Sequence, residues 1–403
     1  MLLTPARAVL LMAFLVLLFN SGARFAMGLM LHPMSLDLGW SRTTLSSTVT
    51  LYLILSASAL PFAGRLVDRF GARLVIAAGV VVSSVSIILM GFIETPAHAL
   101  LLYGVVFAIG SAAMSITPIG VILTRWYPRQ VGMANSIAIS GMGVGQLLII
   151  SVLTSQLMWM GWRGSFVALG LVTVLIVLPI VLIAGRNQPA QTDADPAGSK
   201  SKNNAPAGTG NTSTLAEALR STRLWVLLLI YAICGFQDFL VATHIVAFAL
   251  DEGIGALLAG NMLALMGLAG LAGVLVTGIL NDRYGPAFPT ALCFLLRIAI
   301  FSAILFSRDP AVIIGGALLY GATFWITAPL TVVYARRLCS FALLGTLSGL
   351  ITMVHHFAGG VGAFSGGWIF ETYGSYESAF VALLVMSVLA LLLTWYLREP
   401  DAG

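Results

Sequence analysis

The chain has 403 residues, of which 59% are hydrophobic and only 9% are charged. Soluble globular proteins carry about 25% charged residues, so this composition excludes a chain that covers itself with polar surface in water. The net charge of +5 does not indicate a nucleic-acid partner, because the charges are spread over many loops. Three cysteines without framework spacing indicate neither disulfides nor a zinc site.

Long continuous apolar runs predict membrane-spanning helices. The runs repeatedly reach the roughly 20 residues that cross a bilayer as a helix. Backbone groups in lipid must be satisfied by a helix or a closed barrel, and runs that do not alternate favour helices. We therefore predict an all-α membrane protein with twelve transmembrane helices, at residues 8–34, 43–65, 74–93, 98–123, 131–156, 164–185, 224–250, 257–280, 287–307, 310–334, 342–370 and 377–397.

The basic residues between these spans predict the orientation. With a cytoplasmic N-terminus, fifteen Lys and Arg residues fall on the cytoplasmic side, and only Arg42, Arg163 and Arg308 fall on the other. Positively charged residues are retained on the cytoplasmic side of membranes. The pattern predicts a multi-pass protein of the cytoplasmic (inner) membrane with both termini in the cytoplasm.

The stretch between the sixth and seventh spans divides the chain. Residues 187–213 are rich in Pro, Gly, Ala, Asn, Ser and Thr, which is typical of a flexible linker. We therefore predict an N-terminal six-helix bundle at 1–186 and a C-terminal six-helix bundle at 214–403. The halves also echo each other, since Leu101-Leu102-Tyr103-Gly104 recurs as Leu318-Leu319-Tyr320-Gly321. Repeated halves are typical of transporters with a substrate site between the repeats.

A charged, glycine-flanked motif follows the second span and returns, without its last basic residue, 214 residues later. Two spans joined by so few residues require a tight turn, which glycine permits at positive φ. We expect both loops to act in switching between conformations. Their defining positions are Gly64, Asp68, Arg69, Gly71 and Arg73 in the first copy, and Gly278, Asp282, Arg283 and Gly285 in the second.

This motif, G-x-x-x-D-R-x-G-x-R, resembles the loop signature of the major facilitator superfamily of transporters. Residues 124–129 with 134–145, and residues 359–374, resemble the monocarboxylate porters and the oxalate/formate exchangers of that superfamily. The resemblance implies two pseudo-symmetric halves around a central cavity. It implies transport rather than an enzyme. The sequence has no nucleophile, metal or cofactor motif, and we expect a monomer in the lipid bilayer.

Three charges remain deep inside predicted spans, namely Arg24, Asp238 and Arg297. A charge there costs at least about 2.5 kcal/mol, so each asks for a function or a partner. By the resemblance, the first and seventh spans face each other across the cavity. Arg24 is then a candidate for binding a substrate carboxylate, and Asp238 for carrying a proton. The alternative is a permanent ion pair between the halves. For Arg297, packing against a neighbouring span and substrate contact are both open.

Histidines lie in the same spans, with His244 in the seventh and the pair His355 and His356 in the eleventh. Adjacent residues point about 100° apart on a helix, so we expect one of the pair to face the cavity. Near-neutral titration suits a proton-coupled step. An ordinary interhelical hydrogen bond is the competing interpretation. A metal site that includes Cys234 lacks any supporting ligand spacing.

These observations predict secondary active transport of a small organic anion, with a monocarboxylate and proton symport favoured. Efflux of a drug-like compound or a metalloid, anion exchange, and a receptor on the same scaffold remain alternatives. One departure from the resembled families bears on the substrate, because Val274 and Gly270 stand where those families carry an arginine and an aspartate. The predicted substrate-binding residues are Arg24, Asn20, Tyr52, Thr117, Gln146, Gln237, His244, Arg297, Thr327 and His355, and the predicted proton-coupling residues are Asp238 and His355.

Overall fold

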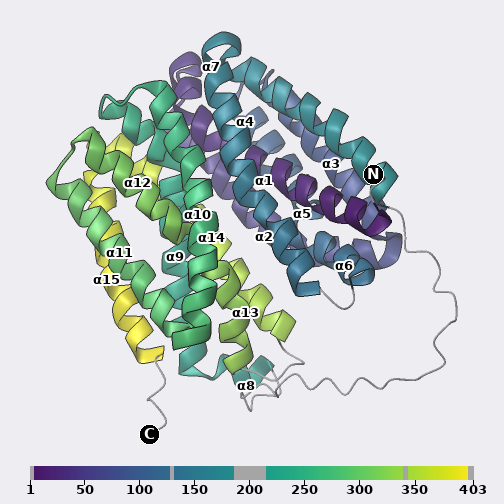
Figure 1. The fold of residues 1–403 in the computed structure, drawn as a ribbon. Coiled ribbons are helices and arrows are strands. Elements are labelled where there is room, and N and C mark those ends of the chain that lie inside the picture. The colour runs from purple at the N-terminus through teal and green to yellow at the C-terminus, as the bar shows by residue number, and fades with distance from the viewer. Residues whose placement is uncertain (1–3, 128–130, 186–214, 339–343, 398–403) are drawn as a thin grey trace, which may run out of the picture.

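The computed structural model describes residues 4–127, 131–185, 215–338 and 344–397, and these residues form helices and short connections without a strand (Figure 1). The linker predicted at 187–213 lies outside the described residues. The helices before it are α1 (Pro5–Leu38), α2 (Arg42–Phe70), α3 (Ala72–Met90), α4 (Pro96–Ala99), η1 (Leu100–Phe107), α5 (Ala108–Ala113), α6 (Ile116–Trp126) and α7 (Val131–Ala184). Those after it are α8 (Leu215–Leu219), α9 (Thr222–Asp251), α10 (Ala256–Tyr284), α11 (Ala287–Phe306), α12 (Pro310–Phe324), α13 (Thr327–Leu338), α14 (Leu344–Tyr373) and α15 (Glu377–Leu397).

The helices follow the predicted spans. Ten segments of the described chain are long and apolar enough to cross a membrane, and α12 is a shorter apolar helix. The 54-residue α7 covers two predicted spans, because the chain turns at Gly161, where φ is 63° and ψ is −179°. Helices α4 to α6 together cover the fourth predicted span, and α12 with α13 cover the tenth. Every predicted span therefore has a helical counterpart.

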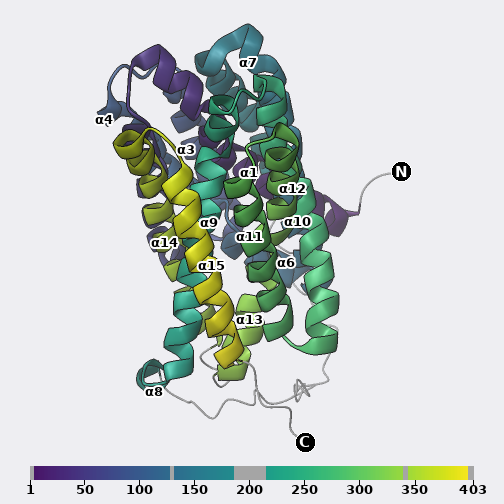
Figure 2. The same cartoon turned by 90° about the vertical axis from the view of Figure 1, so that its left-hand side faces the viewer.

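The two halves lie side by side, the first in purple to blue and the second in green to yellow (Figures 1 and 2). They meet along three pairs of helices, α1 with α9, α2 with α14, and α7 with α10. Each pair takes one helix from each half, and the first helices of the two repeats, α1 and α9, form one of these pairs. The side chains of α1 and α9 are consequently positioned to form a site shared by both halves.

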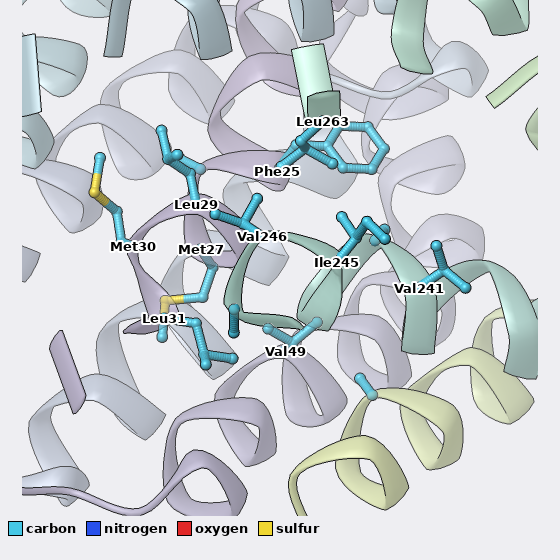
Figure 3. Close-up of a cluster of buried hydrophobic side chains, with 14 of the residues drawn as sticks. Phe25, Met27, Leu29, Met30, Leu31, Val49, Val241, Ile245, Val246 and Leu263 are labelled. Carbon is cyan, nitrogen blue, oxygen red and sulfur yellow. The ribbon is translucent and has the colours of Figure 1, made fainter. Parts of the chain in front are cut away.

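Apolar side chains from both halves fill the space around these helices (Figure 3). Phe25 of α1, Val49 of α2 and Ile245 of α9 all belong to one buried cluster. Close approach of α1 to α9 requires a glycine, since a Cβ at Gly28 would lie 2.5 Å from the carbonyl oxygen of Ala242. In lipid, such packing of helices at small residues is a main source of their association.

The two copies of the charged motif end helices in the same way. Gly71 follows α2 at a φ of 82°, and Gly285 follows α10 at a φ of 75°, both in the region that favours glycine. The turn is thus shorter than the motif. Gly64 and Gly278, which we expected to flank the turn, lie inside α2 and α10. The helical hydrogen-bond ladder simply continues through most of each motif.

The arginines of the motif also correspond between the halves. The guanidinium of Arg69 lies 5.1 Å from the ring centroid of Phe70, and that of Arg283 lies 5.4 Å from that of Tyr284. Arg73 donates through Nη2 to the carbonyl oxygen of Leu182, which ties the start of α3 to the end of α7. The side chain of Asp68 lies outside the described residues, and that of Asp282 accepts a hydrogen bond of 3.3 Å from Asn281.

Candidate functional site

A buried ion pair lies within the C-terminal half. Arg297 of α11 donates through Nη2 to Oδ1 of Asp238 on α9 at 2.6 Å, and the two side chains are 0% and 1% exposed. The predicted set across the cavity placed Asp238 with Arg24, and the alternative was an ion pair between the halves. The described residues contain no ion pair between Arg24 and Asp238. The partner of Asp238 comes from its own half, because the long arginine side chain reaches it from α11.

Three further groups donate to or contact the carboxylate of Asp238. The hydroxyl of Tyr320 donates to Oδ1 at 2.9 Å, the thiol of Cys234 lies 3.4 Å from Oδ2, and Nε2 of His355 lies 3.2 Å from Oδ2. We call Asp238, Arg297, Tyr320, Cys234 and His355 the carboxylate cluster. Its His355 side chain is 15% exposed, more than the side chains of the ion pair. His355 is therefore the most accessible member of the carboxylate cluster.

Arg297 has its remaining hydrogen-bonding groups occupied. Nη1 donates to Oε1 of Gln237 at 3.0 Å, and Nε and Nη2 donate to the hydroxyl and the carbonyl of Thr323 at 3.1 and 3.2 Å. Gln237 is fixed in turn by bonds to the Leu383 carbonyl and the Ser387 hydroxyl. A buried charge is tolerated when it is paired and fully hydrogen-bonded, as this one is.

The carboxylate cluster contains a possible metal-ligand set. The ligand atoms of Cys234, Asp238 and His355 all lie within 4.8 Å of one another. Arg297, however, donates to both Asp238 and the Cys234 sulfur, the latter at 3.6 Å. A metal cation bound there would lie beside a fixed positive charge in a medium of low dielectric. The chemistry of these residues therefore fits a proton better than a metal ion.

Arg24 has a different environment. Its Nη2 lies 3.3 Å from Nε2 of His356, and its guanidinium lies 4.7 Å from the ring centroid of Phe239. Nδ1 of His356 lies 2.9 Å from the Thr352 carbonyl, which requires the hydrogen on Nδ1 and leaves Nε2 to accept from Arg24. This histidine is then neutral. Within the described part of the chain Arg24 forms no ion pair, and its buried Nε has no hydrogen-bond partner.

A small cavity of about 10 Å³ lies beside Arg24, which is room for about one water molecule. Both halves contribute to its wall, and we call it the central cavity. The hydroxyl of Tyr52, one of its lining residues, bonds the Ser111 hydroxyl at 3.1 Å. The lining residues are Arg24, Phe25, Gly28, Val49, Tyr52, Leu53, Phe239, Ala242 and Thr243.

The two neighbouring histidines of α14 join the carboxylate cluster to the central cavity. His355 contacts Asp238 and His356 contacts Arg24, with their ring centroids 5.6 Å apart. We expected one of them to face the cavity. Neither histidine is among the residues that line the central cavity, and both have partners on other helices. The geometry depends on Gly235 of α9, since a Cβ there would lie 1.9 Å from the His355 carbonyl oxygen. The missing side chain brings α14 close enough for both rings to reach interior partners.

The other predicted residues divide between the two halves. Asn20 bonds Ser111 within the N-terminal half, its Oδ1 accepting from the Ser111 hydroxyl at 2.7 Å. Gln146 joins the halves by donating to the Leu263 carbonyl at 2.8 Å. The Thr327 carbonyl accepts from the hydroxyl of Tyr231 at 3.0 Å. Thr117 is exposed on α6 and is not among the residues that line the central cavity.

A polar cluster that the sequence analysis did not single out holds the halves together where α1 ends and α2 begins. Arg42 of α2 binds both carboxylate oxygens of Asp251 on α9, at 2.5 and 2.8 Å, and donates to the hydroxyl of Tyr376 at 2.9 Å. We call these three residues the inter-half lock. Thr43 adds a backbone bond of 2.7 Å to Glu371. The only available signal was that Arg42 is one of few basic residues on its side of the membrane.

His244 belongs to this end of the molecule rather than to the central cavity. Its Nδ1 lies 3.0 Å from the hydroxyl of Tyr376, and its Nε2 lies 2.8 Å from the Ala363 carbonyl. Burial raises the pKa of Tyr376 above its ordinary value, so the phenol keeps its proton. It therefore accepts from Arg42 and donates to His244, which connects the lock to α9 and α14.

Residues 13–363 match the family model described as the Major Facilitator Superfamily. The chain belongs to this superfamily. It is therefore a multi-pass membrane transporter rather than an enzyme, and the resemblance based on the loop motif is confirmed.

Relatives of this superfamily member include human (Homo sapiens) monocarboxylate transporter 11, with 24% identity over 82% of this chain and 70% of that one. The oxalate:formate antiporter of Oxalobacter formigenes is 23% identical over 61% of this chain and 56% of its own. Among solved structures, a bacterial homolog of the human lysosomal transporter Spinster, in an inward-facing and unoccupied conformation, has a TM-score of 0.78 at 18% identity and covers 99% of both chains. This structural likeness shows the fold.

Proposed function

We propose that this superfamily member is a secondary active transporter of a small organic anion, a monocarboxylate in particular, in the cytoplasmic membrane. The observation that carries the proposal is Arg24, a cation beside the central cavity that forms no ion pair among the described residues. Transport is coupled to protons in this proposal. Both termini are cytoplasmic, in accord with the excess of Lys and Arg in the loops on that side.

Charge balance supports an anionic substrate. The two arginines that are buried in the described chain, Arg297 and Arg42, have carboxylate partners in Asp238 and Asp251. Arg24 has a neutral histidine instead. A substrate carboxylate would satisfy its guanidinium with two parallel hydrogen bonds, the geometry that arginine matches best.

The remaining walls favour a small substrate with a short apolar part. Phe25 and Phe239 flank the Arg24 guanidinium, and Val49 and Leu53 line the same cavity. The names of the two relatives, a monocarboxylate transporter and an oxalate:formate antiporter, both refer to small carboxylates. These names support the substrate class, and the second makes anion exchange the competing mode of transport.

The histidines supply a route for proton coupling. An anion on Arg24 takes the guanidinium away from His356, whose Nε2 lone pair would then face the anion. A proton on Nε2 removes that repulsion, so anion and proton favour each other's binding. We propose that this proton reaches His356 from the neighbouring pair of His355 and Asp238, which carries the proton that accompanies the substrate.

The test is uptake of radiolabelled monocarboxylates, such as lactate and pyruvate, into proteoliposomes under an inward proton gradient. Arg24→Ala removes two charge-assisted hydrogen bonds and should weaken binding by about 100-fold or more. Arg24→Lys keeps the charge but loses the planar, two-pronged guanidinium, so its affinity should lie between those of the wild type and Arg24→Ala. Arg308→Ala, which breaks a peripheral ion pair with Glu252, is the matched control. Undiminished uptake by Arg24→Ala would remove the arginine from the site.

A further inference from the structure

A second, larger hollow lies on the side of the molecule, between the end of α3 and the part of α7 that follows Gly161. Its volume is about 680 Å³. One end holds two charged residues, Glu94 and Arg163, and the rest of the wall is apolar, from Phe92 to Leu171. We call this hollow the α3–α7 groove. It belongs to the N-terminal half and is separate from the central cavity.

The groove follows the length of α7. Arg163, Val167 and Leu171 are four residues apart and so lie on one face of the helix, spanning about 12 Å along its axis. Gly164 lies in the groove wall, and the three atoms nearest to a Cβ added there all belong to the side chain of Met160, at 2.9 to 3.9 Å. The shape is that of a channel for a linear apolar chain.

The charged end of the groove lies where a membrane meets water. Trp159, which precedes Met160 of the groove wall in the sequence, is 90% exposed, and Trp162 lies under the Arg163 guanidinium at 4.3 Å. Exposed tryptophans of this kind are typical of the bilayer interface. Below it, Leu175 is 69% exposed on the outer surface of α7. A surface this apolar on a membrane-spanning helix is covered by acyl chains.

The two charges at the mouth are positioned differently. Arg163 is held at the rim, because Nη1 donates to the carbonyls of Gly91 and Ile93, and Nη2 lies 3.6 Å from Oδ2 of Asp37. Glu94 is exposed and forms no ion pair within the described residues. The mouth therefore offers a cation that is held in place and shares its charge with Asp37, and one carboxylate without an ion pair among the described residues.

We propose that the α3–α7 groove binds a phospholipid whose headgroup carries a primary ammonium, of the phosphatidylethanolamine type. The lipid phosphate binds Arg163, the ammonium donates to Glu94, and one acyl chain lies along Val167 and Leu171. A phosphatidylglycerol headgroup lacks the cation and is repelled by Glu94. A choline headgroup has no N–H to donate. This site does not depend on which substrate the protein carries.

The test is native mass spectrometry of the full-length protein in detergent, supplied with equimolar phosphatidylethanolamine and phosphatidylglycerol of identical acyl chains. We expect the wild type to retain the ethanolamine lipid about tenfold more than the glycerol lipid, and Glu94→Gln to lower that preference to near unity. Gly164→Leu should fill the groove and lower retention of both lipids. Glu377→Gln, an exposed carboxylate on α15 away from the groove, is the matched control.

The possible outcomes separate cleanly. A preference for the ethanolamine lipid that is lost in Glu94→Gln and kept in Glu377→Gln supports the site. Equal retention of the two lipids by the wild type, the same preference in both variants, or no retained lipid at all would each overturn it. Glu94 is exposed, so its substitution does not put the fold at risk.

Discussion

Arg297 and Arg24 are both arginines within membrane-spanning helices, but only Arg297 has a carboxylate partner. Arg297 is fully buried, paired with Asp238 at 2.6 Å and hydrogen-bonded to Gln237 and Thr323. Arg24 meets a neutral histidine and an aromatic ring. A charge in the membrane is tolerated only with compensation. The protein supplies that compensation in full at Arg297 and only in part at Arg24, where we propose that the substrate carboxylate supplies the rest.

This difference suggests to us separate roles for the carboxylate cluster and for the central cavity beside Arg24. The ion pair of the carboxylate cluster lies wholly within the C-terminal half, so it does not have to break when the halves move relative to each other. The central cavity is built by α1, α2 and α9, and its walls change when those helices separate. A substrate bound at Arg24, as we propose, would therefore change its contacts when those helices separate. The neighbouring His355 and His356 lie between Arg24 and the carboxylate cluster.

The strongest way to break this comparison is to unpair Arg297. Asp238→Ala leaves a buried, uncompensated guanidinium, and we expect a loss of about 3–5 kcal/mol in the free energy of unfolding. The double variant Asp238→Leu with Arg297→Met removes both charges and should recover most of that loss. Thermal unfolding in detergent measures both. If the single and double variants unfold at the same temperature, the pair is not the stabilising unit that the structure indicates.

A second test asks whether the carboxylate cluster carries the coupled proton. One-to-one symport accumulates an anion tenfold for each pH unit of gradient, equivalent to about 1.4 kcal/mol. Asp238→Asn should abolish this accumulation while keeping counterflow of labelled substrate, which needs no net proton movement. His355→Gln should act in the same direction. Gradient-driven accumulation that survives both substitutions would place the proton elsewhere, with His356 the next candidate.

Much of the fold was predictable, because it depends on features that the sequence displays locally. Apolar runs define the spans, and glycine marks the turns that need positive φ, at Gly71 and Gly285. The repeated motif and its spacing indicated the superfamily. The π-helical opening of the fourth span and the continuation of α2 through Gly64 were not visible, since both depend on hydrogen-bond choices inside a uniformly apolar helix.

The site was predictable only in part, for a geometric reason. The position of a polar residue within a predicted span shows that it lies in the membrane, but it does not show which way the helix is rotated. That rotation is set by packing against neighbouring helices. Arg24 and Asp238 were found because charges there are rare. Thr117, chosen by depth, is exposed, and His244 joins the inter-half lock. Arg42 was counted as a loop charge, although it binds Asp251 across 209 positions of sequence.

The smallest expected effects come from two matched substitutions, one in the carboxylate cluster and one beside the central cavity, and they compare the two regions most directly. Tyr320→Phe removes a hydrogen bond to Asp238 in the carboxylate cluster, and Tyr52→Phe removes one to Ser111 beside the central cavity. Each should cost about 1 kcal/mol of unfolding free energy. Only Tyr52 lines the cavity, so Tyr52→Phe should also change the dissociation constant of a bound monocarboxylate, measured by calorimetry, while Tyr320→Phe leaves it within error. Equal shifts in affinity would show that the two regions bind substrate as one site.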